Sequence, residues 1–329
     1  MRLTDFDYCL PKELIAQFPL EIRDSARLLV VDRAKQEIMH RDFKDFVSYL
    51  HKGDLLVFND TKVLPSRLLG RRSSGGKVEV LLLSRREGLR FKAMLKPGRL
   101  KSGETVVFNE GSLTGRILSK DEIVFDADSI ESVYKEGVMP LPPYIKRQAQ
   151  ELDREYYQTV YAKNDGAIAS PTAGLHFTER LISDIESRQV DTDYVTLHVG
   201  PGTFKSVESE DISLHKMESE YFNIPQGAAA AIGKARDISA RIFAVGTTSL
   251  RALETYASGR REGYTDLFIC PGYKFKSADC LLTNFHLPRT TLFMLVCAFA
   301  GDGLAKRAYQ EAIDKQYRFY SYGDAMLII

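Results

Sequence analysis

The spacing of apolar residues changes along the chain, and this change predicts the architecture. Residues 43–50 carry apolar positions at helical spacing, and residues 54–60 are an apolar run that ends in polar groups, typical of a buried strand. From about residue 65 the pattern changes to short apolar stretches separated by Arg-Glu-Gly and Lys-Pro-Gly turns. Short strands at spacings of roughly ten residues favour a small antiparallel barrel or sandwich, and we expect a barrel. The expected strands cover residues 78–83, 89–95, 105–108, 117 and 123–125.

Beyond residue 145 the pattern becomes that of alternating helices and strands. Residues 178–188 are amphipathic, with Thr178 as the expected N-cap, and an apolar strand follows at 194–199. The first 60 residues are too few to form a domain of their own, so we expect them to join the later α/β segment. The prediction is an α/β main body, with a mixed sheet and helices, formed by residues 1–64 and 146–329, and an inserted small antiparallel β-barrel domain at 65–145. Further helices are expected at 226–237, 247–256, 291–300 and 304–317, and a strand at 241–246.

Composition excludes several classes of protein. With 329 residues, 44% hydrophobic and 27% charged, the chain is typical of a folded globular protein. Its longest apolar run, 292–300, is about half the length that a membrane span needs, and because Asp5 and Asp7 interrupt the first residues we expect no signal peptide there. The four cysteines form no C-x-x-C pair and no zinc or iron–sulfur spacing, so we expect a reducing, cytoplasmic location.

The net charge of +1 conceals a strong separation of charge. Residues 62–101 contain 12 Lys or Arg but only Glu79 and Glu87 as acids, a local balance of +10, whereas the other residues carry −9. Such a strip is often only a solvated sheet face, but polyanion binding gains free energy from each cation engaged, so we favour contact with RNA or DNA. Few aromatic residues accompany the strip, which favours recognition of backbone or shape. The candidate tRNA-binding residues are Arg71, Arg72, Arg85, Arg86, Lys96 and Arg99.

Two nucleotide-binding motifs are tested and rejected. Residues 70–77 resemble a phosphate-binding loop, but a β-like run follows where that loop opens a helix, so a hairpin turn is expected. The Gly200-Pro-Gly202 turn lacks the third glycine of a dinucleotide-binding fingerprint.

Four loops combine Gly or Pro with polar side chains at the ends of predicted elements, where binding groups usually lie. Their histidines are either core residues bonded to backbone carbonyls or functional groups, and both readings stay open. A metal site is disfavoured, because no histidine pair has ligand spacing. The candidate residues in these loops are Thr172 and His176; His198, Gly200, Gly202 and Thr203; Gly246, Thr247, Thr248 and Arg251; and Asn284 and His286.

The Gly246 turn follows an apolar strand and opens a helix, so its N–H groups and hydroxyls either hold an anion or simply cap the helix. Arg251 follows within about one turn, where the helix dipole disfavours a cation, which suggests a carboxylate or phosphate nearby. Glu218 and Glu220 are two residues apart and would share one face of a strand, as a general acid or base pair or as a solvated edge.

Taken together, the loops resemble the S-adenosylmethionine:tRNA ribosyltransferase-isomerase family of the queuosine pathway. The resemblance runs from end to end, with two departures. Glu218 stands where the family often has histidine, and at Arg289-Thr290 the family often has a different first residue and serine as the second. The matching strings include Leu56-Val-Phe-Asn-Asp-Thr-Lys-Val-Leu-Pro, Pro140-Leu-Pro-Pro-Tyr-Ile, Ser170-Pro-Thr-Ala-Gly-Leu-His-Phe-Thr, His198-Val-Gly-Pro-Gly-Thr-Phe, Ala244-Val-Gly-Thr-Thr-Ser-Leu-Arg, Thr283-Asn-Phe-His-Leu-Pro and Tyr320-Ser-Tyr-Gly-Asp-Ala-Met.

The resemblance implies transfer and isomerisation of the ribosyl group of S-adenosylmethionine onto the aminomethyl-deazaguanine wobble base of a tRNA. Epoxyqueuosine forms, and adenine and methionine leave. S-adenosylmethionine is then a substrate, and no metal or other cofactor is expected. The protein is expected to be a monomer and not to associate with a membrane. The proton-accepting base is sought among His176, His198, Glu220 and the substrate amine.

The remaining roles follow from the same chemistry. Asn284 or a protonated His286 would assist departing adenine, and Arg251 or the Gly246 turn would bind the methionine carboxylate. Asp60, at the end of its strand, would bind ribose hydroxyls. Two alternatives from other classes stay open: a non-catalytic RNA-binding protein, which needs only the basic strip, and a metal-free nucleoside hydrolase, which needs only the loops.

Overall fold

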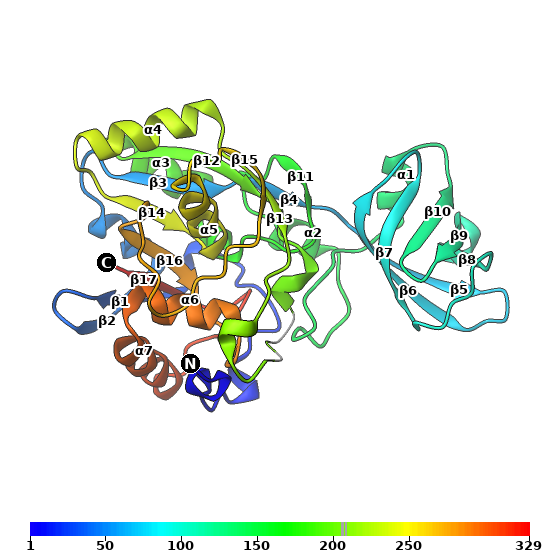
Figure 1. The fold of residues 1–329 in the computed structure, drawn as a ribbon, viewed down its shortest axis with the longest axis horizontal. Coiled ribbons are helices and arrows are strands. Elements are labelled where there is room, and N and C mark those ends of the chain that lie inside the picture. The colour runs from blue at the N-terminus through cyan, green and yellow to red at the C-terminus, as the bar shows by residue number, and fades with distance from the viewer. Residues whose placement is uncertain (205–206, 208) are drawn as a thin grey trace.

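The computed structural model describes residues 1–204, 207 and 209–329, and its main body is built on one mixed sheet (Figure 1). Strands β12, β3, β14 and β16 run parallel to one another, whereas both ends of the sheet include antiparallel pairs. The predicted mixed α/β body is therefore confirmed. In spatial order the nine strands are β15 (Glu262–Thr265), β13 (Glu220–Asn223), β12 (Asp191–Leu197), β3 (Leu55–Asn59), β14 (Ile242–Val245), β16 (Cys280–Asn284), β17 (Ala325–Ile328), β1 (Arg27–Asp32) and β2 (Glu37–Asp42).

Two hydrophobic cores lie on the two faces of this sheet. Leu55 and Val57 of β3 enter one core and Leu56 and Phe58 enter the other, because successive strand residues point to opposite faces. Burial on both faces explains why β3 reads as a continuous apolar run. The first face is covered by α4 (Gln226–Asp237), α5 (Thr247–Tyr256), α6 (Thr291–Ala300) and α7 (Asp302–Asp314), and the second by η4 (Phe43–Tyr49), η6 (Thr172–His176) and α3 (Glu179–Ser187).

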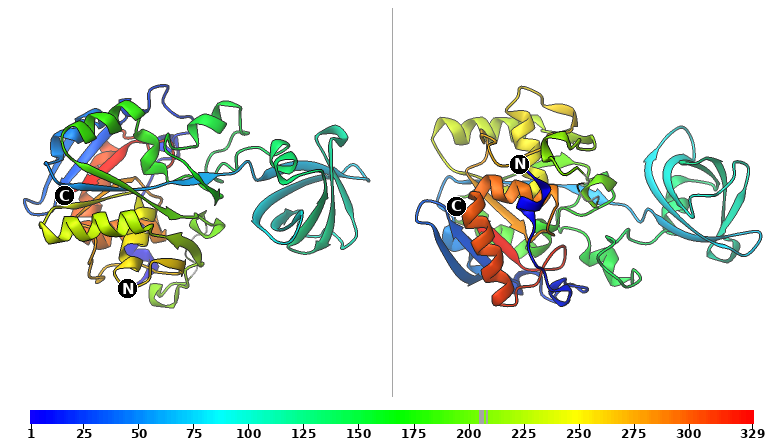
Figure 2. Two further views of the ribbon diagram at one scale, coloured as in Figure 1. Left: turned by 90° about the horizontal axis from the view of Figure 1, so that it is seen from above. Right: turned by 60° about the horizontal axis from the view of Figure 1, so that its bottom comes forward.

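A closed antiparallel barrel projects from the body (Figures 1 and 2). Val78, Val80 and Leu82 of one strand point into its core, whereas the intervening side chains face outward, as the alternating pattern predicted. The predicted barrel is confirmed. Its strands, in order around the barrel, are β10 (Glu122–Asp126), β7 (Arg90–Lys96), β6 (Lys77–Arg85), β5 (Arg67–Arg72), β8 (Thr105–Phe108) and β9 (Leu113–Ser119), and α1 (Ile130–Lys135) packs against their core.

The chain leaves and re-enters the body through two neighbouring segments. Strand β4 (Thr61–Val63) leads toward the barrel, and β11 (Asn164–Ala167), which follows the return, pairs with it in parallel. We propose the division into 1–64 with 146–329 and an inserted 65–145 on this connectivity. The remaining elements are η1 (Leu3–Phe6), η2 (Lys12–Leu14), η3 (Arg23–Ser25), η5 (Asn109–Gly111), α2 (Leu152–Tyr156), η7 (Pro201–Phe204) and η8 (Ile212–Leu214).

Most predicted elements match the structure, and one differs. The helices predicted at 226–237 and 291–300 have those bounds, and the Thr178 side chain caps α3 by accepting the Leu181 N–H at 3.1 Å. Residues 70–77 form the predicted hairpin turn between β5 and β6. Strand β13 begins only at Glu220, so Glu218 precedes the strand and the two carboxylates do not share a strand face. Within the described ranges, the longest apolar helix is too short to span a membrane.

Candidate functional site

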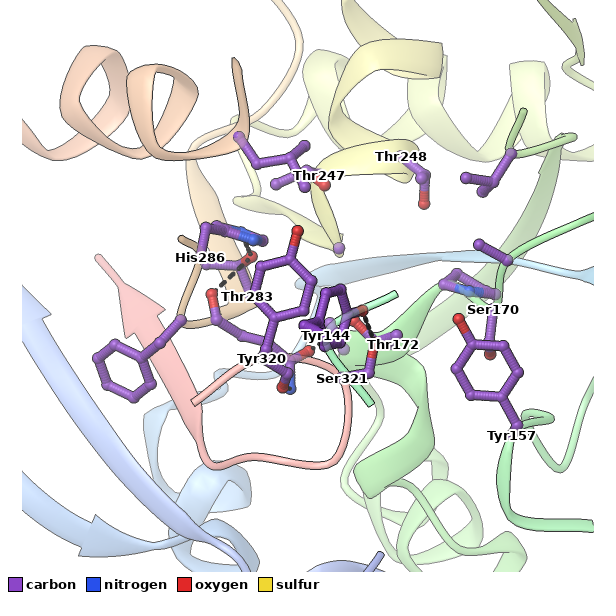
Figure 3. Close-up of a pocket in the computed structure, with 18 residues that line it drawn as sticks. Tyr144, Tyr157, Ser170, Thr172, Thr247, Thr248, Thr283, His286, Tyr320 and Ser321 are labelled. Atoms are coloured by element: carbon purple, nitrogen blue, oxygen red, sulfur yellow. Dashed lines mark hydrogen bonds between the residues drawn. The ribbon is translucent and has the colours of Figure 1, made fainter. Parts of the chain in front are cut away.

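A cavity lies at the carboxyl end of the parallel strands β14 and β16, between the start of α5 and the Tyr320–Ser321 turn (Figure 3). This is the edge of an α/β sheet where ligands usually bind. The space between its walls is about 520 Å³ when the part open to solvent is included. Three of the four predicted loops meet here. They contribute Ser170 and Thr172; Gly246, Thr247 and Thr248; and Thr283, Asn284 and His286.

The N-terminus of α5 forms one wall of the cavity (Figure 3). Gly246 precedes the helix with a φ of 93°, a conformation that favours glycine and turns the chain from strand into helix. The first-turn N–H groups have no partner within the helix. The Thr248 hydroxyl is buried and has no hydrogen bond to any described residue. These donors face the cavity, which favours anion or polar-group binding over simple capping.

Polar groups of β16 line the opposite wall. The Thr172 hydroxyl donates to Asn284 Oδ1 at 3.1 Å, and Thr283 Oγ1 lies 2.8 Å from His286 Nε2. Burial lowers the pKa of His286 to about 3, so its imidazole is neutral at pH 7. Of the two groups expected to assist departing adenine, Asn284 or a protonated His286, burial disfavours the protonated form of His286 and leaves it a neutral ring with one N–H to donate.

His176 lies behind this wall and outside the cavity. Its Nε2 is 3.2 Å from the Asn284 amide nitrogen, and it lines a smaller hollow together with Arg23 and Tyr322. Burial lowers its pKa to about 4. The geometry gives His176 a part in orienting Asn284 and leaves it without direct access to the larger cavity.

A wide groove separates the barrel from the body. Most of the charged side chains on the barrel wall are basic: Arg85, Arg86, Lys92 and Lys135 lie there together with Glu131. The body wall contains residues 198–201 of the fourth predicted loop and the residues around β13. The side chain of Thr203 lies outside the described residues. On the body side the groove is lined by His198, Gly200, Glu218, Glu220, Tyr221 and Tyr264.

His198 is held on three sides in this groove. Its Nδ1 lies 2.7 Å from Thr61 Oγ1, and its ring stacks on Tyr221 with centroids 5.5 Å apart. A Cβ at Gly166 would lie 2.8 Å from His198 Nε2, so only glycine fits beneath the ring. Burial lowers the pKa of His198, although the nearby carboxylates of Asp60 and Asp165 act in the opposite direction. At neutral pH the ring is therefore a neutral group that can accept a proton.

Asp60 supports the wall behind His198. One carboxylate oxygen accepts a hydrogen bond from Thr196 at 2.7 Å and the other from Asn164 at 2.8 Å. The side chain is buried, and within the described structure it lines neither the cavity nor the groove. The geometry thus favours a structural role for Asp60 over the predicted contact with ribose.

The side chains of Glu220 and Arg251 form an ion pair. The guanidinium of Arg251 donates to one oxygen of Glu220, and the other oxygen accepts the Gly200 amide N–H at 2.8 Å. Both side chains are buried. The carboxylate that the sequence predicted beside Arg251 is therefore that of Glu220. A Cβ at Gly202 would lie 2.9 Å from Glu218 Cβ, so this glycine allows the loop to pass close to Glu218.

The six predicted tRNA-binding residues separate into two groups. Arg85 and Arg86 line the groove, at the end of the barrel that faces the body. Strand β5 carries Arg71 and Arg72 toward the opposite end, where Arg72 pairs with Glu104 at 3.4 Å (Figure 1). Lys96 and Arg99 lie near that end as well, since Lys96 is in register with Glu79 of β6.

The cavity and the groove meet at one segment of chain. Val199 lines both, and residues 167–168 border the groove while 169–170 border the cavity. Sequence reasoning missed the tyrosines that complete the two hollows. Tyr144 and Tyr320 line the cavity, and Tyr221 and Tyr264 the groove. The only available signal was that Tyr144 and Tyr320 lie in strings shared with a known family. Among the described residues, no cluster of three or more His, Cys, Asp or Glu is arranged to hold a metal ion.

Comparisons with known proteins find similarity over nearly the whole chain. Residues 3–328 match the family model described as queuosine biosynthesis protein. Proteins called S-adenosylmethionine:tRNA ribosyltransferase-isomerase are similar over the full length of both chains, with 51% identity in Symbiobacterium thermophilum and 48% in a Sulfurihydrogenibium species. The crystal structure of an S-adenosylmethionine tRNA ribosyltransferase from Thermotoga maritima is 37% identical, with a TM-score of 0.59, over 99% of this chain and 100% of that one.

Proposed function

Since this chain belongs to the queuosine biosynthesis protein family, we propose that it is the enzyme that transfers and isomerises the ribosyl group of S-adenosylmethionine onto a tRNA. The acceptor is the aminomethyl-deazaguanine wobble base, the product is epoxyqueuosine, and adenine and methionine leave. The observation that carries this proposal is that Val199 lines both a cavity with polar walls and a groove whose barrel side carries several cations. A reaction between a small molecule and an RNA base needs such a junction.

S-adenosylmethionine fits the cavity by its chemistry. The free N–H groups at the start of α5 and the Thr248 hydroxyl suit the methionine carboxylate. Arg251 pairs with Glu220 and is not among the residues that line the cavity, so the helix N-terminus is the better of the two predicted carboxylate sites. The neutral His286 on the opposite wall suits a hydrogen bond to adenine. S-adenosylmethionine is consumed as a substrate, and no metal takes part.

The tRNA lies in the groove, with phosphates on the barrel wall and bases on the body wall. His198 is the best-placed protein group to take the proton next to the sulfonium, because it is neutral and lines the groove beside Val199. In the tautomer in which His198 Nδ1–H donates to Thr61 Oγ1, Nε2 carries no hydrogen and accepts the proton. Glu220 acts through the Gly200 loop, and the substrate amine remains the other candidate base. The protein acts as a monomer in the cytoplasm.

The experiment that tests this function is release of adenine. The protein is incubated with S-adenosylmethionine and a tRNA that carries aminomethyl-deazaguanine, and adenine, methionine and modified tRNA are measured by mass spectrometry. Equal amounts of all three, formed only when this tRNA is present, are expected. Adenine released without tRNA supports a nucleoside hydrolase instead. Tight RNA binding without any adenine supports a non-catalytic RNA-binding protein.

A further inference from the structure

Tyr264 is a large aromatic side chain that projects into the groove while 65% of its surface is exposed. It lies on β15, directly opposite Tyr221 of β13 in the antiparallel pairing. The two rings meet edge to face, with centroids 5.8 Å apart at 74°. One exposed aromatic residue alone is ordinary, but this one belongs to a row of rings.

The row runs from the rim of the groove to the candidate base. Tyr264 contacts Tyr221, and Tyr221 stacks on His198 with an interplanar angle of 23°. The Tyr221 hydroxyl donates to Glu262 at 2.7 Å, which fixes the middle ring. Backbone pairing between β13 and β15 holds the two tyrosines in register. The exposed face of Tyr264 is therefore presented on a rigid support, which limits the entropy lost when a flat ligand stacks on it.

The two walls of the groove differ in charge: Asp165, Glu218 and Glu220 lie on the body wall, whereas the charged side chains of the barrel wall are mainly cations. Arg85, Arg86 and Lys92 lie on the barrel wall, opposite the row of rings. Cations that track a phosphate backbone, together with an aromatic surface for bases, are the combination that binds single-stranded nucleic acid. An apolar protein segment would gain nothing from the cations.

We propose that Tyr264 is a stacking platform for an unpaired nucleobase of the tRNA loop that carries the reactive base. This inference rests on the proposed function for the identity of the RNA. Tyr221 and His198 support the platform, and the stacked base lies at the entrance to the groove. The neighbouring nucleotide is thereby directed toward His198 and the cavity.

The test measures binding of an RNA hairpin with an anticodon-type loop, without the modified base, to the full-length protein. Tyr264→Ala is expected to weaken binding by about 5- to 150-fold, the range for the loss of one base–aromatic stack, and Tyr264→Phe to change it less than about twofold. Phe18→Ala is the matched control, because Phe18 is also exposed but packs on Arg147 away from the groove.

The stacked nucleotide is then located by replacing the loop nucleotides one at a time with abasic ones. At the position whose base stacks on Tyr264, removing the base is expected to weaken binding of the hairpin to the wild-type protein. The same abasic hairpin is expected to bind the Tyr264→Ala variant about as well as the intact hairpin does, because the stack is already lost in this variant. Equal losses in both proteins at every position, or wild-type affinity of Tyr264→Ala for every hairpin, would overturn the platform. Thermal unfolding of Tyr264→Ala confirms that the variant is folded.

The outcomes also separate the platform from the proposed function. Position-specific coupling in the hairpin assay without adenine release from the modified tRNA would support the platform and overturn the proposed reaction. Normal adenine release by the wild-type protein, together with unchanged RNA binding by Tyr264→Ala, would support the proposed reaction and overturn the platform.

Discussion

The carboxylate of Glu220 and the guanidinium of Arg251 form a buried ion pair at the floor of the groove, and the same carboxylate holds the Gly200 amide. Arg251 comes from α5, whose first turn lines the cavity, and Gly200 belongs to the loop that lines the groove. One carboxylate thus connects the two hollows. Glu220 is better described as a positioning residue than as a general acid or base.

This connection predicts a large loss of stability when the pair is broken. Arg251→Met removes the guanidinium from its ion pair with the buried Glu220 carboxylate, and we expect the free energy of unfolding to fall by about 3–5 kcal/mol. Glu220→Gln, which keeps an oxygen for the Gly200 N–H, should cost less. Urea unfolding measures both changes. The double variant should be more stable than the sum of the single losses predicts, by about 0.5–3 kcal/mol, and strict additivity would contradict direct coupling.

Much of the fold was predictable because its periodic patterns are local. The apolar run of β3, the alternation in β6 and the cap at Thr178 each depend on a few neighbouring residues. The start of β13 at Glu220 was not predictable, because Glu220 is fixed by Arg251, 31 positions away. Helical spacing at residues 43–50 indicated a helix but did not reveal that it is a 3₁₀-helix.

The sequence predicted which loops form the candidate site, but much less well where their individual side chains lie. Residues near Thr172, Gly246 and Asn284 form one cavity, as the placement of polar groups at element ends suggested. His176 resembles them in sequence, but its ring lies on the far side of Asn284. Tyr320 reaches the cavity through a turn with a φ of 74°, a backbone conformation that no side-chain pattern predicts.

The Thr248 hydroxyl provides a test of the substrate site. It is buried at the start of α5 without a hydrogen bond to the described residues, so a bound S-adenosylmethionine is expected to supply its partner. Thr248→Val keeps the shape and removes the hydroxyl, and should raise the KM for S-adenosylmethionine about 2- to 12-fold. Calorimetric binding of S-adenosylmethionine should weaken in parallel. Thr248→Ser, the matched control, should retain most of the affinity, and unchanged binding by Thr248→Val would remove this residue from the site.

The two buried histidines predict a pH dependence of stability. Burial lowers the pKa of His286 to about 3 and of His176 to about 4, below the ordinary value of 6.5. Between pH 6.5 and about 4 the unfolded chain therefore binds protons at both histidines that the folded protein does not. The stabilisation is fully present above pH 6.5, and the free energy of unfolding falls as the pH falls through this window.

Urea unfolding at several pH values between 7.5 and 4.5 measures this slope. His286→Gln and His176→Gln should each reduce the slope of the free energy of unfolding against pH by the equivalent of about one bound proton. This change in slope is expected whatever the effect of the substitution on stability at pH 7.5. An unchanged slope in either variant would mean that its histidine titrates normally in the folded protein.

The two ends of the barrel allow RNA contact to be separated from overall charge. Arg85 and Arg86 line the groove, whereas Arg71 and Lys77 face each other across the β5–β6 turn at the opposite end. Replacing Arg85 and Arg86 together with alanine should weaken tRNA binding and reduce the slope of log affinity against log salt by about 0.7–0.9 for each phosphate that these arginines neutralise. Replacing Arg71 and Lys77 removes the same charge and should change affinity and slope much less. Filter binding at salt concentrations from about 50 to 200 mM distinguishes the two pairs. Equal losses would show that tRNA responds to the net charge of the barrel, and the groove would then no longer be the favoured path of the RNA.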